Sequence, residues 1–193
     1  MKTADSITIA VSPRPKRADA ARNYDKLLAA AREAFTDDGA DASLEGIARR
    51  AGVGIGTLYR NFPTRQALLE AVYVDEVETI CRAAGGLDDR EPWDALVTWL
   101  RSFSDYAATK RALGAELMSY MDKEAEMFTQ CRGSIISAGE PLLEAARRAG
   151  VVRQDVDIVD VVRMVGGIAT MQHADPGQVD RILNVALDGL RPR

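Results

Sequence analysis

The sequence of 193 residues is poor in the residues that build covalent frameworks and metal sites, with two cysteines and one histidine, His173. Cys81 and Cys131 cannot form a disulfide framework or a four-cysteine zinc site, and a single histidine excludes multi-histidine metal sites. The sequence also lacks a nucleophile elbow, a phosphate-binding loop and a paired-carboxylate motif. We therefore expect no metal, no cofactor and no enzymatic activity, and we expect both cysteines to be buried thiols.

Long apolar runs are missing as well. No run approaches the roughly 20 residues of a membrane-spanning helix, and residues 1–11 mix charged and polar residues with short apolar stretches, unlike a secretion signal. The composition is 47% hydrophobic and 28% charged, which is typical of a globular protein. These features predict a soluble, cytoplasmic protein without a membrane partner.

The formal net charge of −4 does not by itself favour a polyanionic partner, but the charge is unevenly distributed. The sequence up to Gln66 holds 11 of the 25 Lys and Arg residues and only 8 of the 29 Asp and Glu residues, a local balance of +3. The rest of the chain carries −7. The basic residues are therefore concentrated in the N-terminal part.

The N-terminal part predicts a short arm followed by helices. Residues 1–17 contain Pro13 and Pro15 among crowded cations, which forbids a continuous helix and indicates a flexible basic arm. From Ala18, apolar residues recur at helical spacing until Gly39, which suits a left-handed helix C-cap.

Two short helices and one long helix come next. Ser43 can cap the first short helix, which closes at Gly52, and the second runs from near Gly54 to residue 61 or 62, before Pro63. Thr64 can cap the long helix, within which we place a boundary between domains at 18–70 and 71–193. Further helices are predicted at about 91–106, 111–120, 123–149, 156–173 and 178–190, with no convincing strand, so the fold class is all-α.

Short helices separated by a tight turn with a small residue, here Ala51-Gly52-Val53-Gly54, are what a helix-turn-helix requires. The segment from Ser43 to Leu68 resembles the TetR family of transcriptional regulators. It matches that family's pattern at Ala51-Gly52-Val53, Gly56-Thr57-Leu58-Tyr59, Phe62 and Arg65. Gly54 and Asn61 depart from the serine or other polar residue and the histidine that the family commonly has, which bears on base preference.

The predicted DNA contacts follow partly from helix geometry and partly from this resemblance. Thr57, Arg60 and Asn61 lie opposite the inward-facing Leu58 and Phe62, as a helix in the major groove requires. The resemblance implies that Tyr59 and Arg65 contact phosphates, while Ile55 either contacts a thymine methyl or packs internally. The full set is Ser43, Ile55, Gly56, Thr57, Tyr59, Arg60, Asn61 and Arg65, with Arg14, Lys16 and Arg17 either in the minor groove or in a solvated tail.

The resemblance further implies a C-terminal helical domain that binds a small effector and forms a homodimer through its last two helices. Gly166 and Gly167 in one helix and an apolar stripe on the next support close packing of a partner, although the glycines could instead mark a kink. Met and aromatic residues either line an effector pocket or fill the core, and the only histidine is either a helix-end cap or a polar pocket group. The candidates are Trp99, Phe103, Tyr106, Met118, Met121, Phe128, Met164, Met171 and His173.

Together these features predict a ligand-responsive regulator, a repressor that binds a pseudo-palindromic operator as a dimer and is released by an apolar or aromatic effector. Its partners would be double-stranded operator DNA, a second copy of the chain and that effector. The alternative is a helical ligand carrier or protein-interaction module that retains the helix-turn-helix only as a scaffold. This alternative predicts no preference for operator over random DNA.

Overall fold

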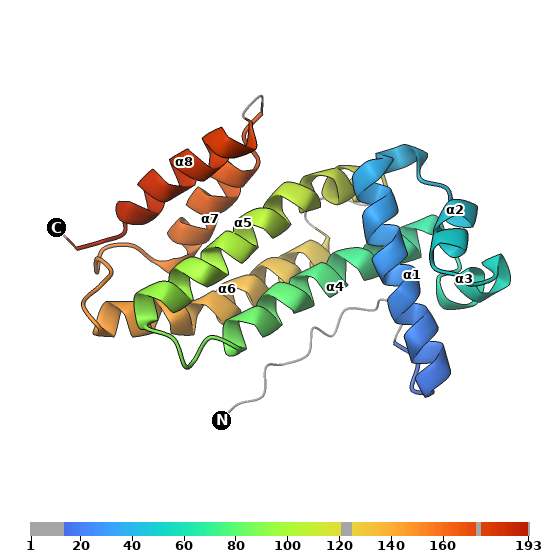
Figure 1. The fold of residues 1–193 in the computed structure, drawn as a ribbon, viewed down its shortest axis with the longest axis horizontal. Coiled ribbons are helices and arrows are strands. Elements are labelled where there is room, and N and C mark those ends of the chain that lie inside the picture. The colour runs from blue at the N-terminus through green and yellow to red at the C-terminus, as the bar shows by residue number, and fades with distance from the viewer. Residues whose placement is uncertain (1–13, 121–124, 173–174, 193) are drawn as a thin grey trace. The chain divides into compact units, whose positions relative to one another are not determined.

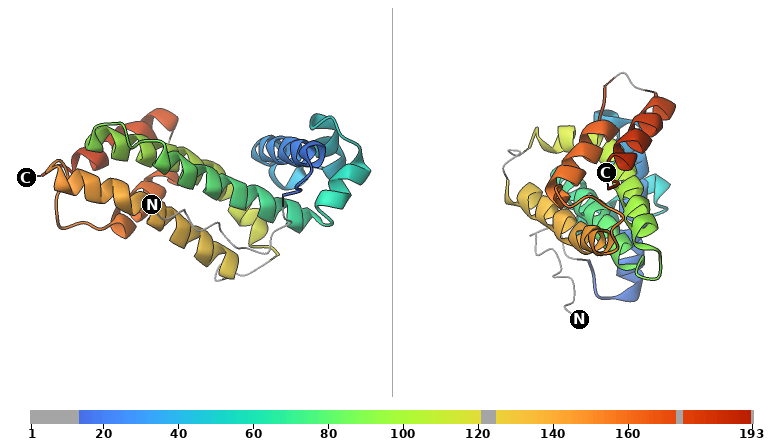
Figure 2. Two further views of the ribbon diagram at one scale, coloured as in Figure 1. Left: turned by 90° about the horizontal axis from the view of Figure 1, so that it is seen from below. Right: turned by 90° about the vertical axis from the view of Figure 1, so that its left-hand side faces the viewer.

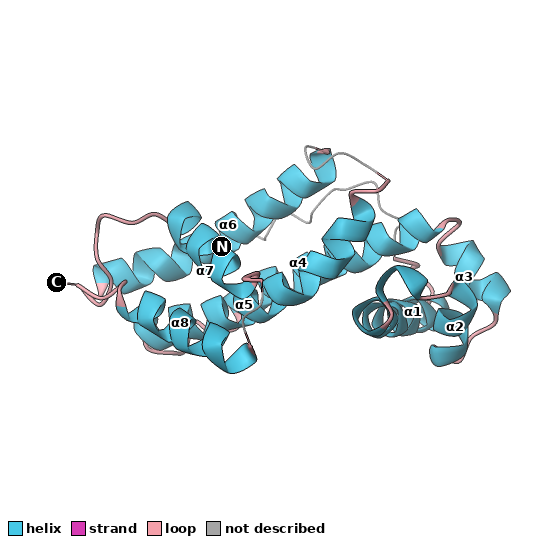
Figure 3. Ribbon diagram, turned by 90° about the horizontal axis from the view of Figure 1, so that it is seen from above, coloured by secondary structure: helices cyan, strands magenta, loops and turns pink. Residues whose placement is uncertain are grey.

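A computed structural model describes residues 14–192 except 121–124 and 173–174, and these residues form helices and loops without a strand (Figures 1 and 3). This confirms the prediction of an all-helical protein. No helix in this part of the chain is long and apolar enough to cross a membrane. The elements in order are α1 (Ala18–Asp37), the 3-10 turn η1 (Gly39–Asp41), α2 (Leu44–Arg50), α3 (Ile55–Asn61), α4 (Arg65–Gly85), α5 (Pro92–Leu117), α6 (Glu126–Arg148), α7 (Ile158–Ala169) and α8 (Pro176–Asp188).

One predicted helix break was wrong. The sequence pattern predicts separate helices at 91–106 and 111–120, whereas α5 continues from Pro92 to Leu117. Residues 107–110 contain neither glycine nor proline, so nothing in their backbone chemistry interrupts the helix. Gly166 and Gly167 also lie within α7 without ending it.

The chain divides into two compact units. The first unit consists of residues 1–76 with 110–130, and the second unit consists of residues 77–109 with 131–193. Helices α4, α5 and α6 each contribute one part to each unit. The predicted domain boundary near residue 70 falls within α4, and it stays a prediction.

In the first unit, α1 is an amphipathic helix whose apolar face is buried. Its buried side chains recur at helical spacing and include Tyr24, Leu27, Leu28, Ala31 and Phe35. α1 packs against α2, and α2 packs against α3. The three helices therefore share one small core, as a helix-turn-helix requires.

The turn between α2 and α3 is closed by a Schellman motif. The Val53 N–H donates to the Ala48 carbonyl at 3.0 Å and the Gly52 N–H donates to the Arg49 carbonyl at 3.1 Å. Gly52 has φ of +67°, a left-handed conformation that costs a residue with a Cβ about 1–2 kcal/mol. The glycine thus allows the chain to turn sharply from α2 into α3.

An ion-pair cluster ties α1 to α4 within the first unit. The Arg32 guanidinium lies 2.7 Å from the Asp75 carboxylate and also contacts the carboxylate of Glu76. Burial raises the pKa of Glu76, and the neighbouring Asp75 raises it further, while Arg32 opposes both effects. The side chain of Arg32 therefore offsets part of the cost of holding two carboxylates at the edge of the core.

The core of the second unit is built around Trp99. Its side chain is fully buried, and its indole N–H donates to the Ile80 carbonyl at 3.2 Å. Phe103 stacks on Trp99 with ring centroids 6.0 Å apart. Gly139 of α6 lies against the indole, where a Cβ would come within 2.4 Å of a ring carbon. The close approach of α6 to Trp99 therefore depends on the missing side chain at Gly139.

The last two helices of the second unit, α7 and α8, lie side by side (Figure 2). Asp157 caps α7 by accepting from the Asp160 N–H at 2.8 Å, and Asp175 caps α8 by accepting from the Gln178 N–H at 2.9 Å. Pro176 stands in the first turn of α8, where its missing N–H has no cost. Both helices thus begin at well-defined caps.

Candidate nucleic-acid interface

Helix α3 has one face in the core and one face in solvent. Leu58 and Phe62 are fully buried, and the Phe62 ring packs against Tyr24 of α1 with centroids 4.9 Å apart. The aromatic contact adds about 0.5–1.5 kcal/mol to the benefit of area burial. These two anchors fix the rotation of the helix about its axis, so its opposite face has a defined orientation.

The exposed face of α3 carries the side chains that the sequence predicts to meet DNA. Tyr59 is 45% exposed and Ile55 is 37% exposed, and Gly56 and Arg60 are also exposed. Thr57 and Asn61 are half-buried. The exposure of Ile55 leaves it able to make an apolar contact outside the protein.

The polar side chains of α3 bond to their own helix in the absence of a partner. Arg60 donates through Nε to the Gly56 carbonyl at 3.1 Å and through Nη2 to the Thr57 hydroxyl at 3.1 Å. Asn61 donates through Nδ2 to the Thr57 carbonyl at 2.7 Å. The bonds of Arg60 are exposed to solvent and are therefore inexpensive to exchange for bonds to another acceptor.

Ser43 is placed at the start of α2, as the sequence predicts. Its hydroxyl oxygen accepts from the Gly46 N–H at 3.0 Å, which makes it the N-cap. Accepting a bond leaves the hydroxyl proton available for donation to an anion. A Cβ on Gly46 would lie 2.9 Å from this hydroxyl oxygen, so the glycine leaves room for the cap.

Arg65 is placed differently from the expectation that it contacts a phosphate. Its side chain is only 21% exposed, and its Nε lies 2.6 Å from a carboxylate oxygen of Glu116. It also donates to the carbonyls of Ala42 and Gly39, and its guanidinium lies over the Phe35 ring. Sequence reasoning missed this arrangement because Glu116 is 51 residues away along the chain.

The described part of the arm is also partly bound to the protein. Arg14 makes a two-pronged ion pair with Asp25 of α1, through Nε at 2.9 Å and Nη2 at 2.5 Å. This pairing, mainly through the hydrogen bond, lowers the pKa of Asp25 and raises that of Arg14. Lys16 and Arg17 are exposed, and their side chains make no ion pair within the described residues. A surface hollow of about 580 Å³ lies among these residues and the first turn of α1.

One exposed cation beside the turn was not singled out from the sequence. Arg49 lies in the last turn of α2, and its side chain has no polar partner in the part of the chain that is described. Its neighbour Arg50 pairs with Asp37 of α1 at 3.1 Å. The adjacency of Arg49 to the Gly52 turn was the signal that could have identified it.

The predicted effector-pocket residues do not gather in one place. Trp99, Phe103 and Tyr106 form an aromatic cluster in the core of the second unit, with Met164 half-buried in the same unit, whereas Phe128 is buried in the first unit against Tyr73. The expectation that Met118 and Met171 line a pocket or fill the core was wrong in this structure. Their side chains are 53% and 38% exposed. Met121 and His173 lie outside the described residues.

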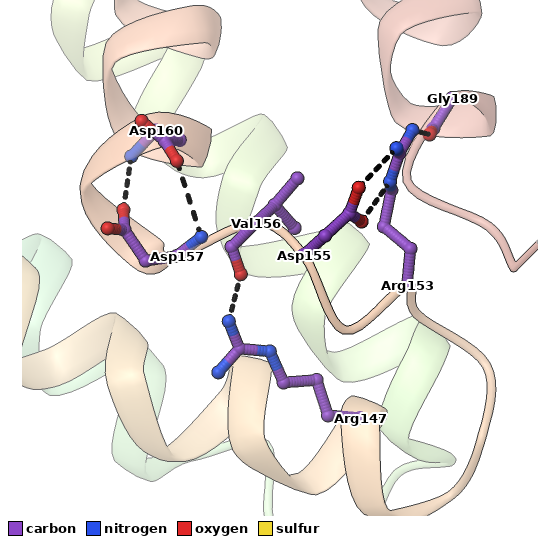
Figure 4. Close-up of polar contacts among 7 residues, drawn as sticks. All are labelled: Arg147, Arg153, Asp155, Val156, Asp157, Asp160 and Gly189. Carbon is purple, nitrogen blue, oxygen red and sulfur yellow. Dashed lines mark hydrogen bonds and ion pairs between the residues drawn. The ribbon is translucent and has the colours of Figure 1, made fainter.

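A hollow of about 340 Å³ in the second unit is of a different kind. It is lined by residues of the loop after α6 and by Pro192. Figure 4 shows that the polar groups here bind one another, since Arg153 pairs with Asp155 at 2.6 Å and Arg147 donates to the Val156 carbonyl. The described residues also contain no cluster of three or more His, Cys, Asp and Glu side chains suited to a metal.

A helix with an exposed polar face, held by a tight glycine turn on a second helix, defines the class of helix-turn-helix DNA-binding proteins. Residues 27–72 match the profile of bacterial regulatory proteins of the tetR family, and residues 91–192 match the C-terminal domain of SbtR-like transcriptional regulators. These two matches cover the exposed α3 face and most of the remaining chain.

Solved structures agree with these profiles. The TetR transcriptional regulator SCO0520 from Streptomyces coelicolor is 44% identical, with 87% of this chain and 98% of that chain covered and a TM-score of 0.77. A TetR transcription regulatory protein from Mycobacterium vanbaalenii is 35% identical, with 92% and 100% covered and a TM-score of 0.75. The curated regulator UidR from Escherichia coli K12 is 24% identical over 145 residues, 72% of this chain and 74% of UidR.

The chain therefore belongs to the TetR family of transcriptional regulators, and it is a DNA-binding regulator rather than an enzyme. The family resemblance inferred from the Ser43 to Leu68 segment is confirmed.

Proposed function

We propose that this regulator is a repressor that binds a pseudo-palindromic operator as a homodimer and leaves it when a small apolar or aromatic effector binds. In this proposal residues 18–70 bind DNA, and residues 71–193 bind the effector and dimerise. The observation that supports it most directly is the exposed face of α3, oriented by the buried Leu58 and Phe62. A two-turn helix with this orientation fits the major groove.

The side chains on this face divide into two roles. Thr57 and Arg60 meet base edges, for which Arg60 exchanges its bonds to its own helix for acceptors such as those of guanine. Tyr59 and the Ser43 hydroxyl donate to phosphates, which fixes register without reading sequence. Gly56 allows the backbone to approach the groove closely, and Ile55 supplies an apolar contact to a thymine methyl. Asn61, already bonded to the Thr57 carbonyl, acts mainly within the helix.

The exposed cations add attraction to the DNA backbone. Lys16 and Arg17 of the arm and Arg49 of α2 are free to neutralise phosphates, whereas Arg14 anchors the arm through its ion pair with Asp25. Each phosphate neutralised releases condensed counterions, so the affinity falls steeply as the salt concentration rises. This division gives Arg14 a different task from its two neighbours.

Dimerisation is assigned to α7 and α8. Val185 of α8 is 74% exposed, although it lies in an otherwise apolar stripe, and Gly167 of α7 is exposed. An exposed apolar stripe beside a small residue suits packing against the same surface of a second copy around a two-fold axis. A dimer of this kind would present two α3 helices to two half-sites of the operator.

The effector is assigned to the second unit because Trp99, Phe103 and Tyr106 bring three aromatic rings together there. A pocket opening beside such rings favours an apolar or aromatic ligand. Effector binding would favour dimers in which the spacing of the two α3 helices no longer matches successive major grooves.

The test is fluorescence anisotropy with duplex DNA from upstream of the protein's own gene and with a scrambled duplex of the same composition. We expect the wild-type protein to bind the upstream duplex at least about a thousandfold more tightly at physiological salt. Equal affinity for the two duplexes, at every salt concentration, would instead favour a carrier or interaction module that keeps the helix-turn-helix as a scaffold.

A further inference from the structure

Arg65 stands where three segments of the first unit meet. It is the first residue of α4, its Nε lies 2.6 Å from the Glu116 carboxylate of α5, and its two terminal nitrogens donate to carbonyls in and after η1. The two side chains of the ion pair are 21% and 12% exposed. A planar guanidinium can hold a carboxylate and two carbonyls at once, which the single ammonium of lysine cannot reproduce.

This arrangement leaves little of Arg65 for a phosphate. The donors on Nε, Nη1 and Nη2 are each engaged, and one face of the guanidinium is covered by the Phe35 ring at 5.1 Å. A contact with DNA would have to break the pair with Glu116 and leave a largely buried carboxylate without its cation, which is costly.

Arg65 is also close in sequence to the DNA-reading helix. Only Phe62, Pro63 and Thr64 separate it from the end of α3, and Thr64 caps α4 by accepting from the Ala67 N–H at 3.0 Å. A shift of Arg65 therefore moves the short link that holds the C-terminal end of α3. Phe62, on this link, is the buried anchor that packs on Tyr24.

We propose that Arg65 is a positioning residue for DNA binding and that Glu116 is its obligatory partner. The pair holds the start of α4 against the segment after α1, and through it holds α3 in the orientation that reads DNA. This inference rests on the proposed function. Because Glu116 belongs to α5, in the part of the chain assigned to the effector, the pair makes the orientation of α3 depend on the position of α5.

The first experiment measures operator affinity by anisotropy between 50 and 200 mM salt for Arg65→Lys, Arg65→Gln and Glu116→Gln, a range over which backbone contacts are resolved as roughly 0.9 unit of slope each. Glu126→Gln, which removes an exposed negative charge from the same unit, is the control for general electrostatics. A positioning role predicts that Arg65→Lys and Glu116→Gln each weaken binding about tenfold with the salt slope unchanged, because the phosphate contacts themselves are intact.

A phosphate contact predicts the opposite pattern. Arg65→Lys would bind almost normally, because lysine also serves phosphates, and Arg65→Gln would lower the salt slope by about 0.9. Glu116→Gln would tighten binding more than Glu126→Gln does, because it would release Arg65. Either a reduced slope for Arg65→Gln or tighter binding by Glu116→Gln overturns the proposal.

The second experiment needs no DNA, so it separates this inference from the proposed function. Amide hydrogen exchange is measured in the three variants at the first turn of α4 and in α3, with α8 as an internal reference. We expect at least about tenfold faster exchange in α3 and α4 for Arg65→Lys and Glu116→Gln, an effect no larger in the double variant, and no change in α8. Unchanged exchange in α3 contradicts the positioning role even if operator binding is confirmed.

Discussion

The two glycines of the helix-turn-helix, Gly52 and Gly54, predict stability effects of opposite sign. At Gly52, with φ of +67°, an added Cβ meets no atom within 4 Å, so replacement by alanine has a purely conformational cost. That cost is about 1–2 kcal/mol for a left-handed residue, and the lower entropy of the unfolded chain offsets part of it. We therefore expect Gly52→Ala to lower the free energy of unfolding by about 1 kcal/mol.

Gly54 is the N-cap of α3 with φ of −72° and ψ of 147°, and it offers no side-chain cap. An added Cβ there also meets no atom within 4 Å. Serine can adopt this conformation, accept from an unpaired amide of α3 and reduce the entropy of the unfolded chain, so Gly54→Ser should stabilise by about 0.5–1 kcal/mol.

The assay is urea unfolding followed by circular dichroism, with all proteins at one protomer concentration because dimerisation contributes to stability. The midpoint should fall for Gly52→Ala and rise for Gly54→Ser, and Gly52→Asn should lie between Gly52→Ala and the wild type because asparagine tolerates the left-handed region. Equal midpoints for Gly52→Ala and the wild type would refute the assigned turn geometry. A loss of stability in Gly54→Ser would refute its assignment as an uncapped N-cap.

Three further predictions concern the second unit. Gly139→Ala should destabilise by about 1–3 kcal/mol in the same assay, because its Cβ would lie 2.4 Å from Trp99, whereas Gly133→Ala, with open space on the same helix, should not destabilise. Burial raises the pKa of Cys81 to about 11, so iodoacetamide at pH 8 should alkylate it roughly a hundredfold more slowly than the unfolded chain, and comparable rates would contradict the burial. Val185→Asp should shift the protein from dimer to monomer in sedimentation velocity, while Gln178→Asp on the same helix should not, and a persistent dimer would place the interface elsewhere.

The parts of the fold that depend on local chemistry could be predicted from the sequence. Ser43, Thr64 and Gly52 act through hydrogen bonds or dihedral angles within a few residues, and the structure places each in its predicted role. The buried anchors Leu58 and Phe62 follow from helical periodicity in the same way. The exposed face of α3 is the direct consequence of these local features.

The parts that depend on distant contacts could not be predicted. The pairing of Arg65 with Glu116 joins residues whose proximity no local pattern encodes, so the motif indicated a phosphate contact instead. Met118 was similarly misplaced, because apolar character alone does not say whether the end of a helix is covered. The position of an ionic or apolar side chain becomes known only when the packing of its neighbours is known.

The face of α3 is tested most directly by the operator and scrambled-duplex affinities of Tyr59→Ala and Arg60→Ala. A surface that enters the major groove predicts that Tyr59→Ala weakens both duplexes nearly equally, by about 1–3 kcal/mol, while Arg60→Ala weakens the operator by a similar amount and reduces the discrimination between them. Wild-type affinity and discrimination in both variants would contradict it.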